Sequence, residues 1–187
     1  TLLRSWICMP LIVGLKERSE GTVRALLGPE LMTDDGLLTQ QGSSTFWDRS
    51  TLYALRGIYN VGQADRATEL LHRYSQRRLL VPYPIEAWPE GSQRHLSAES
   101  GLYCRIITEG LFGIRPTGLR SFDLTPSMPA AWKSMSLRHI RAFGSDFDIT
   151  VARVADGRLR ITVARPGAKP KIYRAAPGAT IRVKLTD

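Results

Sequence analysis

Apolar residues recur at helical spacing through the first part of the chain, which predicts an array of helices. Four segments carry this pattern: residues 10–27, 46–61, 64–79 and 98–112. A glycine follows three of them, at Gly28, Gly62 and Gly113, as is common where a helix ends. The stripe expected to face inward on the second helix consists of Leu52, Leu55, Ile58 and Tyr59.

Beyond about residue 117 the period changes, and short runs alternate apolar with polar residues, as strands do. The clearest hairpin signal is ITVARV–ADG–RLRITVARP, at residues 149–166, with a turn at Asp156-Gly157. We therefore predict an α+β protein with two domains: helices over 1–117 and an antiparallel β domain over 118–187.

The helix order also predicts where two polar loops lie. Consecutive helices with modest connections pack antiparallel, so the second and fourth helices should point the same way. The loops that precede them, residues 33–45 and 81–96, should then open at the same end of the array. Each loop leads into or contains acidic and aromatic residues.

The segment 82–100, PYPIEAWPEGSQRHLSAES, carries three carboxylates, Glu86, Glu90 and Glu99, among prolines and aromatic residues. A long connection of this composition is typical of a functional loop rather than a disordered one. Cleavage of a glycosidic bond needs two carboxyl groups, and aromatic planes stack on sugar rings. Carboxylates in a loop also serve simply as solvated surface, so the composition leaves both roles open.

Composition narrows the function classes. The chain has 187 residues, 43% of them hydrophobic, and a net charge of +9. Its arginines are spread without a nucleic-acid motif, and no apolar run reaches the length of a membrane span. Cys8 and Cys104 lie in apolar helical context, without metal-binding spacing, and are predicted to be buried free thiols. We expect no metal, no cofactor, no nucleic-acid partner and no membrane span.

Three stretches resemble the C-terminal part of six-hairpin (α/α)6-barrel glycosidases such as glucoamylases, glycogen-debranching α-glucosidases and α-L-rhamnosidases. The stretches are MTDDGLLTQQGSSTFWDRSTLYALRGIYNVGQADRATELL, EAWPEGSQRHLSAESGLY and SGLYCRIITEGLFGIRPTGLRSFDLTPSMPAAWKSM. The resemblance implies a partial (α/α) toroid, made of the final hairpins of the barrel, followed by an antiparallel β-sandwich. It implies a glycoside hydrolase that acts on an oligo- or polysaccharide with inversion.

Within this resemblance, Glu86 occupies the position of the general base that activates water, with Glu90 as the competing candidate. The aromatic positions that line the pocket fall on Trp47 and Trp88. Candidate contacts to sugar hydroxyls are Asp48, Arg49, Arg94 and His95. Glu99, in the first turn of a helix, is expected to interact with the helix dipole instead.

The resemblance places the general acid in an earlier part of the barrel, which this sequence does not contain. The chain also begins at Thr1, directly in helix-like sequence, so we expect a fragment that needs the remainder of the barrel and is inactive alone. Two alternatives stay open: a carbohydrate-binding or structural module, and a glycoside phosphorylase. Bacterial enzymes of this kind are often periplasmic or extracellular, and we expect the same here.

Overall fold

The computed structural model describes residues 2–78, 87–88 and 97–185. The chain forms two compact units, Thr1–Leu111 and Phe112–Asp187, which we call the α unit and the β unit. The protein is a mixed α+β protein, as predicted, and every strand pair within the described residues is antiparallel. None of the helices in these residues combines the length and the apolar character needed to cross a membrane.

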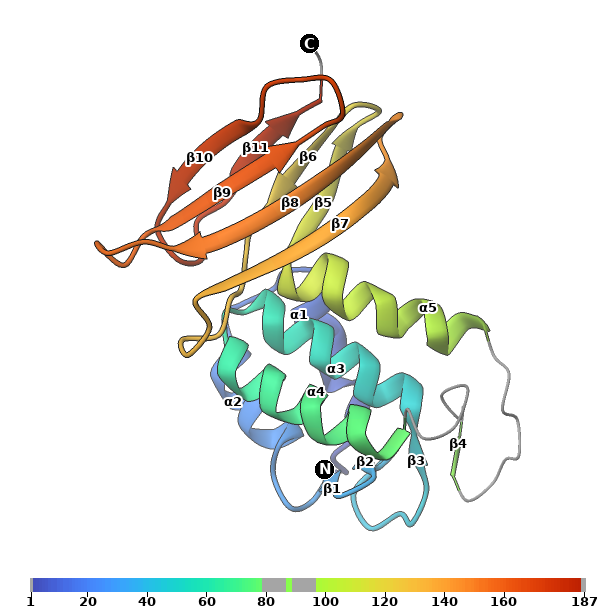
Figure 1. Cartoon of the computed structure of the whole chain (residues 1–187). Helices are drawn as coiled ribbons and strands as arrows, with labels where there is room; N and C mark the ends of the chain where they lie inside the picture. Colours follow the sequence, from blue (N-terminus) through green and yellow to red (C-terminus); the bar gives the residue numbers. More distant parts are fainter. Residues whose placement is uncertain (1, 79–86, 89–96, 186–187) are drawn as a thin grey trace. The chain divides into compact units, whose positions relative to one another are not determined.

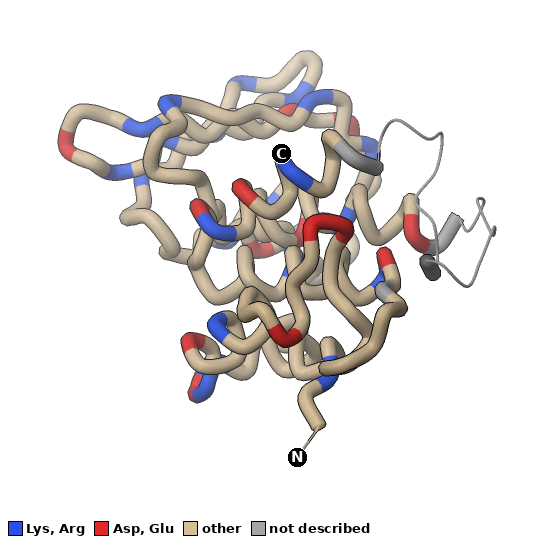
Figure 2. Tube along the Cα trace, turned by 90° about the horizontal axis from the view of Figure 1, so that it is seen from below, with Lys and Arg blue, Asp and Glu red and all other residues tan. Residues whose placement is uncertain are grey.

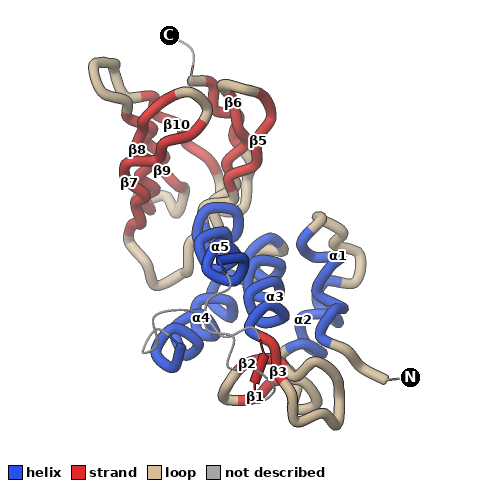
Figure 3. Tube along the Cα trace, turned by 90° about the vertical axis from the view of Figure 1, so that its right-hand side faces the viewer, coloured by secondary structure: helices blue, strands red, loops and turns tan. Residues whose placement is uncertain are grey.

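The α unit consists mainly of helices, and α3 lies among the others in Figures 1 and 3. The helices are α1 (Met9–Ile12), α2 (Ser19–Leu26), α3 (Asp48–Asn60), α4 (Ala64–Arg78) and α5 (Ser97–Arg105), with the 3-10 turn η1 (Ser5–Cys8) and the π-helical turn η2 (Ile106–Leu111). The predicted inward stripe of α3 is confirmed, since all four of its residues are at most 1% exposed.

Two glycines let other elements approach α3 closely. A Cβ placed on Gly57 would lie 2.9 Å from the Cβ of Leu11 in α1, and one placed on Gly110 would lie 3.2 Å from the ring of Tyr59. Both distances are shorter than ordinary carbon–carbon contacts. The packing of α1 and η2 on α3 therefore requires glycine at these two positions.

The predicted helix over residues 10–27 is wrong, because the chain forms two separate helices there. The break contains Gly14, whose φ of 88° lies in the left-handed region, and then the charged residues Lys16, Glu17 and Arg18. A glycine in this conformation ends α1, and the exposed charged run separates it from α2.

The long loops of the α unit contain four short strands. They are β1 (Met32–Thr33), β2 (Gly36–Leu37), β3 (Phe46–Trp47) and β4 (Ala87–Trp88), paired as β1–β2 and β3–β4. The first pair is attached to α3, because the backbone N–H of Leu37 donates to Thr51 Oγ1 at 2.9 Å. This bond places the β1–β2 hairpin at the beginning of α3.

The β unit contains two antiparallel sheets, with strand orders β10-β9-β8-β7 and β11-β6-β5 (Figure 1). The strands are β5 (Ile114–Gly118), β6 (Ser121–Leu124), β7 (Ser134–Ala142), β8 (Ser145–Arg153), β9 (Leu159–Ala164), β10 (Lys171–Ala175) and β11 (Ile181–Lys184). The hairpin predicted from residues 149–166 is confirmed as β8–β9.

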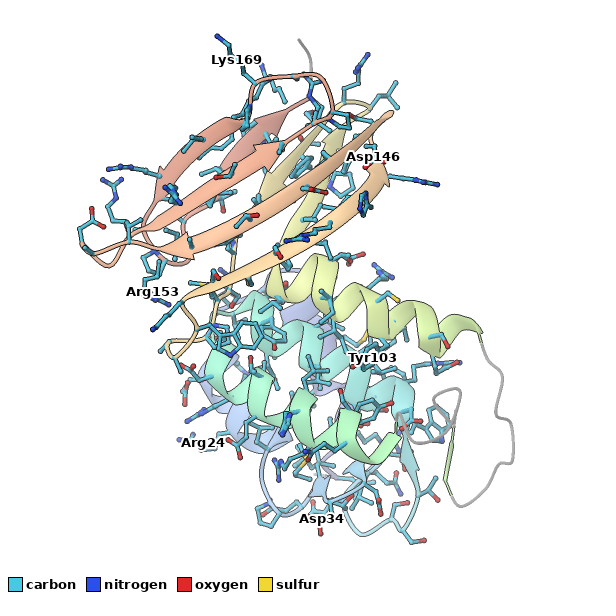
Figure 4. The ribbon with its side chains drawn as sticks, in the orientation of Figure 1. Arg24, Asp34, Tyr103, Asp146, Arg153 and Lys169 are labelled. Atoms are coloured by element: carbon cyan, nitrogen blue, oxygen red, sulfur yellow. The ribbon has the colours of Figure 1, made fainter. Side chains whose placement is uncertain are left out.

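Side chains from both sheets share one core. Phe122 of β6 stacks on Phe147 of β8, with 5.5 Å between ring centroids, and on Phe143 at 5.0 Å. Phe147, Ile149 and Val151 alternate inward along β8, whose ends are marked by Asp146 and Arg153 in Figure 4. The period of two read from the sequence therefore identifies the core-facing residues of this strand.

The start of the β unit depends on Gly113, which has a φ of 65° and lies against the carbonyl of Thr125. A Cβ at this position would lie 2.2 Å from that oxygen, whereas Gly144, with a φ of 66°, has open space around it.

We predict that Gly113→Ala lowers the free energy of unfolding by about 3 kcal/mol, since it combines left-handed strain with a backbone clash. Gly144→Ala carries the strain alone and should cost about 1 kcal/mol. Urea unfolding of both variants measures the difference. Equal losses would show that the contact with Thr125 adds nothing.

Candidate functional site

The pairing of β3 with β4 joins two segments that lie far apart in the sequence. Phe46 is opposite Trp88 and Trp47 is opposite Ala87. Because β3 leads directly into α3, the pair lies at the beginning of that helix (Figure 1). This pairing agrees with the predicted meeting of the loops before the second and fourth helices at residues 87–88; the rest of the second loop lies outside the described residues.

Trp47 belongs to a small aromatic cluster. Its ring meets that of Trp6 edge to face, at 6.2 Å between centroids and 80° between planes, and Trp6 also contacts Tyr53 at 6.1 Å. The Nε1–H of Trp47 is buried and finds no acceptor among the described residues. Trp6, which is not among the residues predicted for the site, is 36% exposed.

Asp48 is the first residue of α3 and is completely buried. A carboxylate in the first turn of a helix interacts favourably with the partial positive charge of the exposed N–H groups. Asp48 is therefore a buried residue beside Trp47 rather than an exposed contact.

Arg49 and Glu99 form an ion pair between α3 and α5. The Nε–H of Arg49 donates to Glu99 Oε1 at 2.7 Å. The side chain of Glu99 is 0% exposed, whereas that of Arg49 is 31% exposed. Of the charged residues Asp48, Arg49 and Glu99, only Arg49 therefore reaches the surface, and a buried carboxylate fixes its orientation. Glu99 does lie in the first turn of α5, as expected, but this pairing was missed.

The other predicted site residues lie partly outside the described residues. Trp88 is in β4, next to Trp47's strand. The candidate base Glu86, its competitor Glu90, and the candidate contacts Arg94 and His95 lie outside the described residues. No cluster of His, Cys, Asp and Glu within the described part has the arrangement of a metal site.

Comparison with known proteins adds no relative: no family model matches this chain, and no curated protein matches it.

A second charged network links α3 to the π-helical turn η2. Arg56 donates from Nη1 to Glu109 Oε2 at 2.8 Å and lies over the ring of Tyr53, with 5.6 Å to its centroid. Arg105 donates to both oxygens of Glu109, and this hydrogen bonding raises the pKa of Arg105. One carboxylate thus balances two guanidinium groups, of which Arg56 is buried.

Helices α4 and α5 also contact each other through aromatic residues. The ring of Tyr103, labelled in Figure 4, stacks on that of Tyr74 with 6.4 Å between centroids. Its hydroxyl forms a hydrogen bond of 2.7 Å with that of Ser75. These contacts fix α5, and with it Glu99, relative to α4.

The two cysteines differ in environment, which corrects the prediction that both are buried. Cys8 is buried, and burial raises the pKa of its thiol to about 12, whereas Cys104 is exposed on α5. A thiol that stays protonated at neutral pH is a poor nucleophile, so Cys8 is a packing residue.

We predict that Arg49→Ala lowers the free energy of unfolding by about 3 kcal/mol, because it leaves the buried carboxylate of Glu99 without its cation. Arg66→Ala is the matched control: Arg66 pairs with Glu20 at 3.4 Å, both side chains are more than half exposed, and the loss should stay below about 1 kcal/mol. Denaturant titration gives both values. Similar losses for the two variants would contradict the structural role of the Arg49–Glu99 pair.

We predict that a thiol reagent at pH 8 modifies Cys104 rapidly and Cys8 only on unfolding. Because burial raises the pKa of Cys8, the free energy of unfolding is expected to fall at alkaline pH. Its contribution to stability is complete below the ordinary thiol pKa of 9.0 and is lost as pH rises from there to about 12. Counting modified thiols by mass spectrometry tests the first point. Fast labelling of Cys8 in the native protein would be the contrary result.

Proposed function

We propose that this chain forms the final helical hairpins and the C-terminal β-sandwich of a six-hairpin glycoside hydrolase. The observation that carries the proposal is the pairing of β3 with β4. It unites the segment of the tryptophan platform with the segment of the candidate base, the two parts that such a site must bring together.

Glu86 immediately precedes β4 in the sequence and serves as the general base. Trp47 provides the aromatic surface for a sugar ring, since the register places Trp47 and Trp88 on opposite faces of the β3–β4 pair. Arg49 donates hydrogen bonds to sugar hydroxyls, and the buried Glu99 holds its guanidinium in place. A side chain oriented in advance loses little entropy when the substrate binds, which favours positioning of the scissile bond.

The reaction is a single displacement with inversion. Glu86 accepts a proton from a water molecule, and the water oxygen attacks the anomeric carbon as the glycosidic bond breaks. The leaving oxygen takes its proton from an acid supplied by the remainder of the barrel. The partners of this chain are therefore a carbohydrate substrate and the rest of the barrel, from the same parent chain or a companion chain.

We predict that Glu86→Gln in the complete enzyme lowers the turnover number by about 10²–10⁴-fold while sugar binding is retained, because only activation of water is lost. Glu90→Gln is the matched control in the same loop and should leave turnover nearly unchanged. A chromatographic assay of released sugar, with binding followed by calorimetry, measures both effects.

The other outcomes assign the function differently. Undiminished turnover in Glu86→Gln with loss in Glu90→Gln would move the base to Glu90. Sugar release that depends on inorganic phosphate would indicate a phosphorylase, and sugar binding without turnover in the complete protein would indicate a binding module. The anomer of the first product, observed by proton NMR, tests inversion directly.

A further inference from the structure

The net positive charge of the protein comes from one unit. In the α unit 12 Lys and Arg balance 12 Asp and Glu, whereas the β unit has 14 basic residues against five acidic ones. The whole net charge of +9 therefore belongs to the β unit. Figure 2 colours these charges along the chain.

Two of these basic residues lie directly opposite each other on the outward face of the four-stranded sheet. Arg160 of β9 pairs in register with Arg174 of β10, and both are exposed. Their neighbours on β9, Leu159 and Ile161, are buried, so the alternation of the strand directs Arg160 outward.

A row of hydroxyl groups crosses the same face beside the arginines. Thr162 is opposite Thr150 on β8, and Thr150 is opposite Ser136 on β7. Thr162 is two residues from Arg160 on the same strand, so the two rows are adjacent. We call the surface made by Arg160, Arg174, Thr162, Thr150 and Ser136 the arginine–hydroxyl face.

The arginine pair is unfavourable in the isolated protein. Like charges directly opposite in a sheet repel, and neither guanidinium has an ion-pair partner among the residues that the structure describes. Elsewhere in the β unit, the guanidinium of Arg182 is neutralised by the carboxylate of Asp123, in contrast to Arg160 and Arg174. An anion bound between Arg160 and Arg174 would remove the repulsion and accept hydrogen bonds from both.

We propose that the arginine–hydroxyl face binds an acidic polysaccharide. Its carboxylate or sulfate groups pair with Arg160 and Arg174, and its hydroxyl groups bond to the threonine and serine row. A sheet that binds single-stranded nucleic acid uses aromatic rings as stacking platforms. The described outward positions of this face carry no aromatic ring; the large apolar side chain there is Ile172, 63% exposed. The row of hydroxyl groups beside the arginine pair supplies hydrogen-bond partners for sugar hydroxyls, so the chemistry of the face favours an acidic sugar polymer.

This proposal goes beyond the proposed hydrolase site and does not depend on it, since binding by the β unit is measured without cleavage. Failure of the catalytic proposal would leave the face intact. Loss of binding at the face would leave Glu86 and its loop unaffected.

The test measures the affinity of the full chain for polygalacturonate, for a sulfated glycan and for neutral dextran by calorimetry. We expect binding to one or both acidic polymers, none to dextran, and weakening as salt is raised. Arg160→Gln combined with Arg174→Gln should weaken binding by about tenfold or more, because two charge-assisted hydrogen bonds are lost.

The matched control is Arg115→Gln combined with Arg120→Gln. These exposed residues lie in β5 and in the turn between β5 and β6, so the control removes the same charge away from the face. It should leave the affinity within about twofold. A second variant, Arg174→Glu, places a carboxylate opposite Arg160. It should raise the thermal midpoint through a cross-strand ion pair while abolishing binding, which separates loss of binding from loss of folding.

Three results would overturn the proposal. One is unchanged affinity in the Arg160→Gln, Arg174→Gln variant, and another is equal weakening in the control. The third is tighter binding to single-stranded DNA or to phosphatidylglycerol vesicles than to either acidic polymer, which would assign the face to a different class of partner.

Discussion

Burial of α3 among the other helices of the α unit is the constraint on which the candidate site depends. Ten of its 13 residues are buried, so charged groups along it require partners within the protein. Arg49 finds Glu99 in α5, and Arg56 finds Glu109 in η2. The two ion pairs fix α3 to α5–η2, and the first of them lies beside the β3–β4 pair. Burial of α3 thus determines both the packing of the helices and the position of Arg49 beside the β3–β4 pair.

Much of the fold follows from periodicity in the sequence. The stripe of α3 and the β8–β9 hairpin were predicted because an uninterrupted pattern agrees with tertiary burial there. The helix over residues 10–27 was wrong because apolar spacing continues on both sides of Gly14 and does not reveal the left-handed turn between them. Strand β5 was missed because its residues after Ile114 are exposed, so they carry no inward–outward alternation.

The meeting of β3 with β4 follows from the predicted helix order, whereas the side-chain contacts around it do not. Helix order was sufficient to place residues 46–47 near residues 87–88, since it depends only on the number of reversals in the chain. The Arg49–Glu99 bond depends on the rotation of α3 and α5 about their axes, which apolar spacing determines only approximately. Their positions in the first turns of two helices that point the same way are a signal that could have suggested the pair. Trp6 had no such signal, because an aromatic residue in an apolar run suits a core equally well.

The division of charge between the units has a consequence for how the protein meets a charged polymer. Long-range electrostatic attraction acts on net charge and is felt before any specific contact forms. The α unit, which has no net charge, and the strongly basic β unit therefore differ in their long-range attraction to a polyanion. The electrostatic attraction of a polyanion acts on the β unit, whereas the α unit contributes no net charge to it. At low salt, the rate at which a polyanion reaches the protein is then governed by the charge of the β unit.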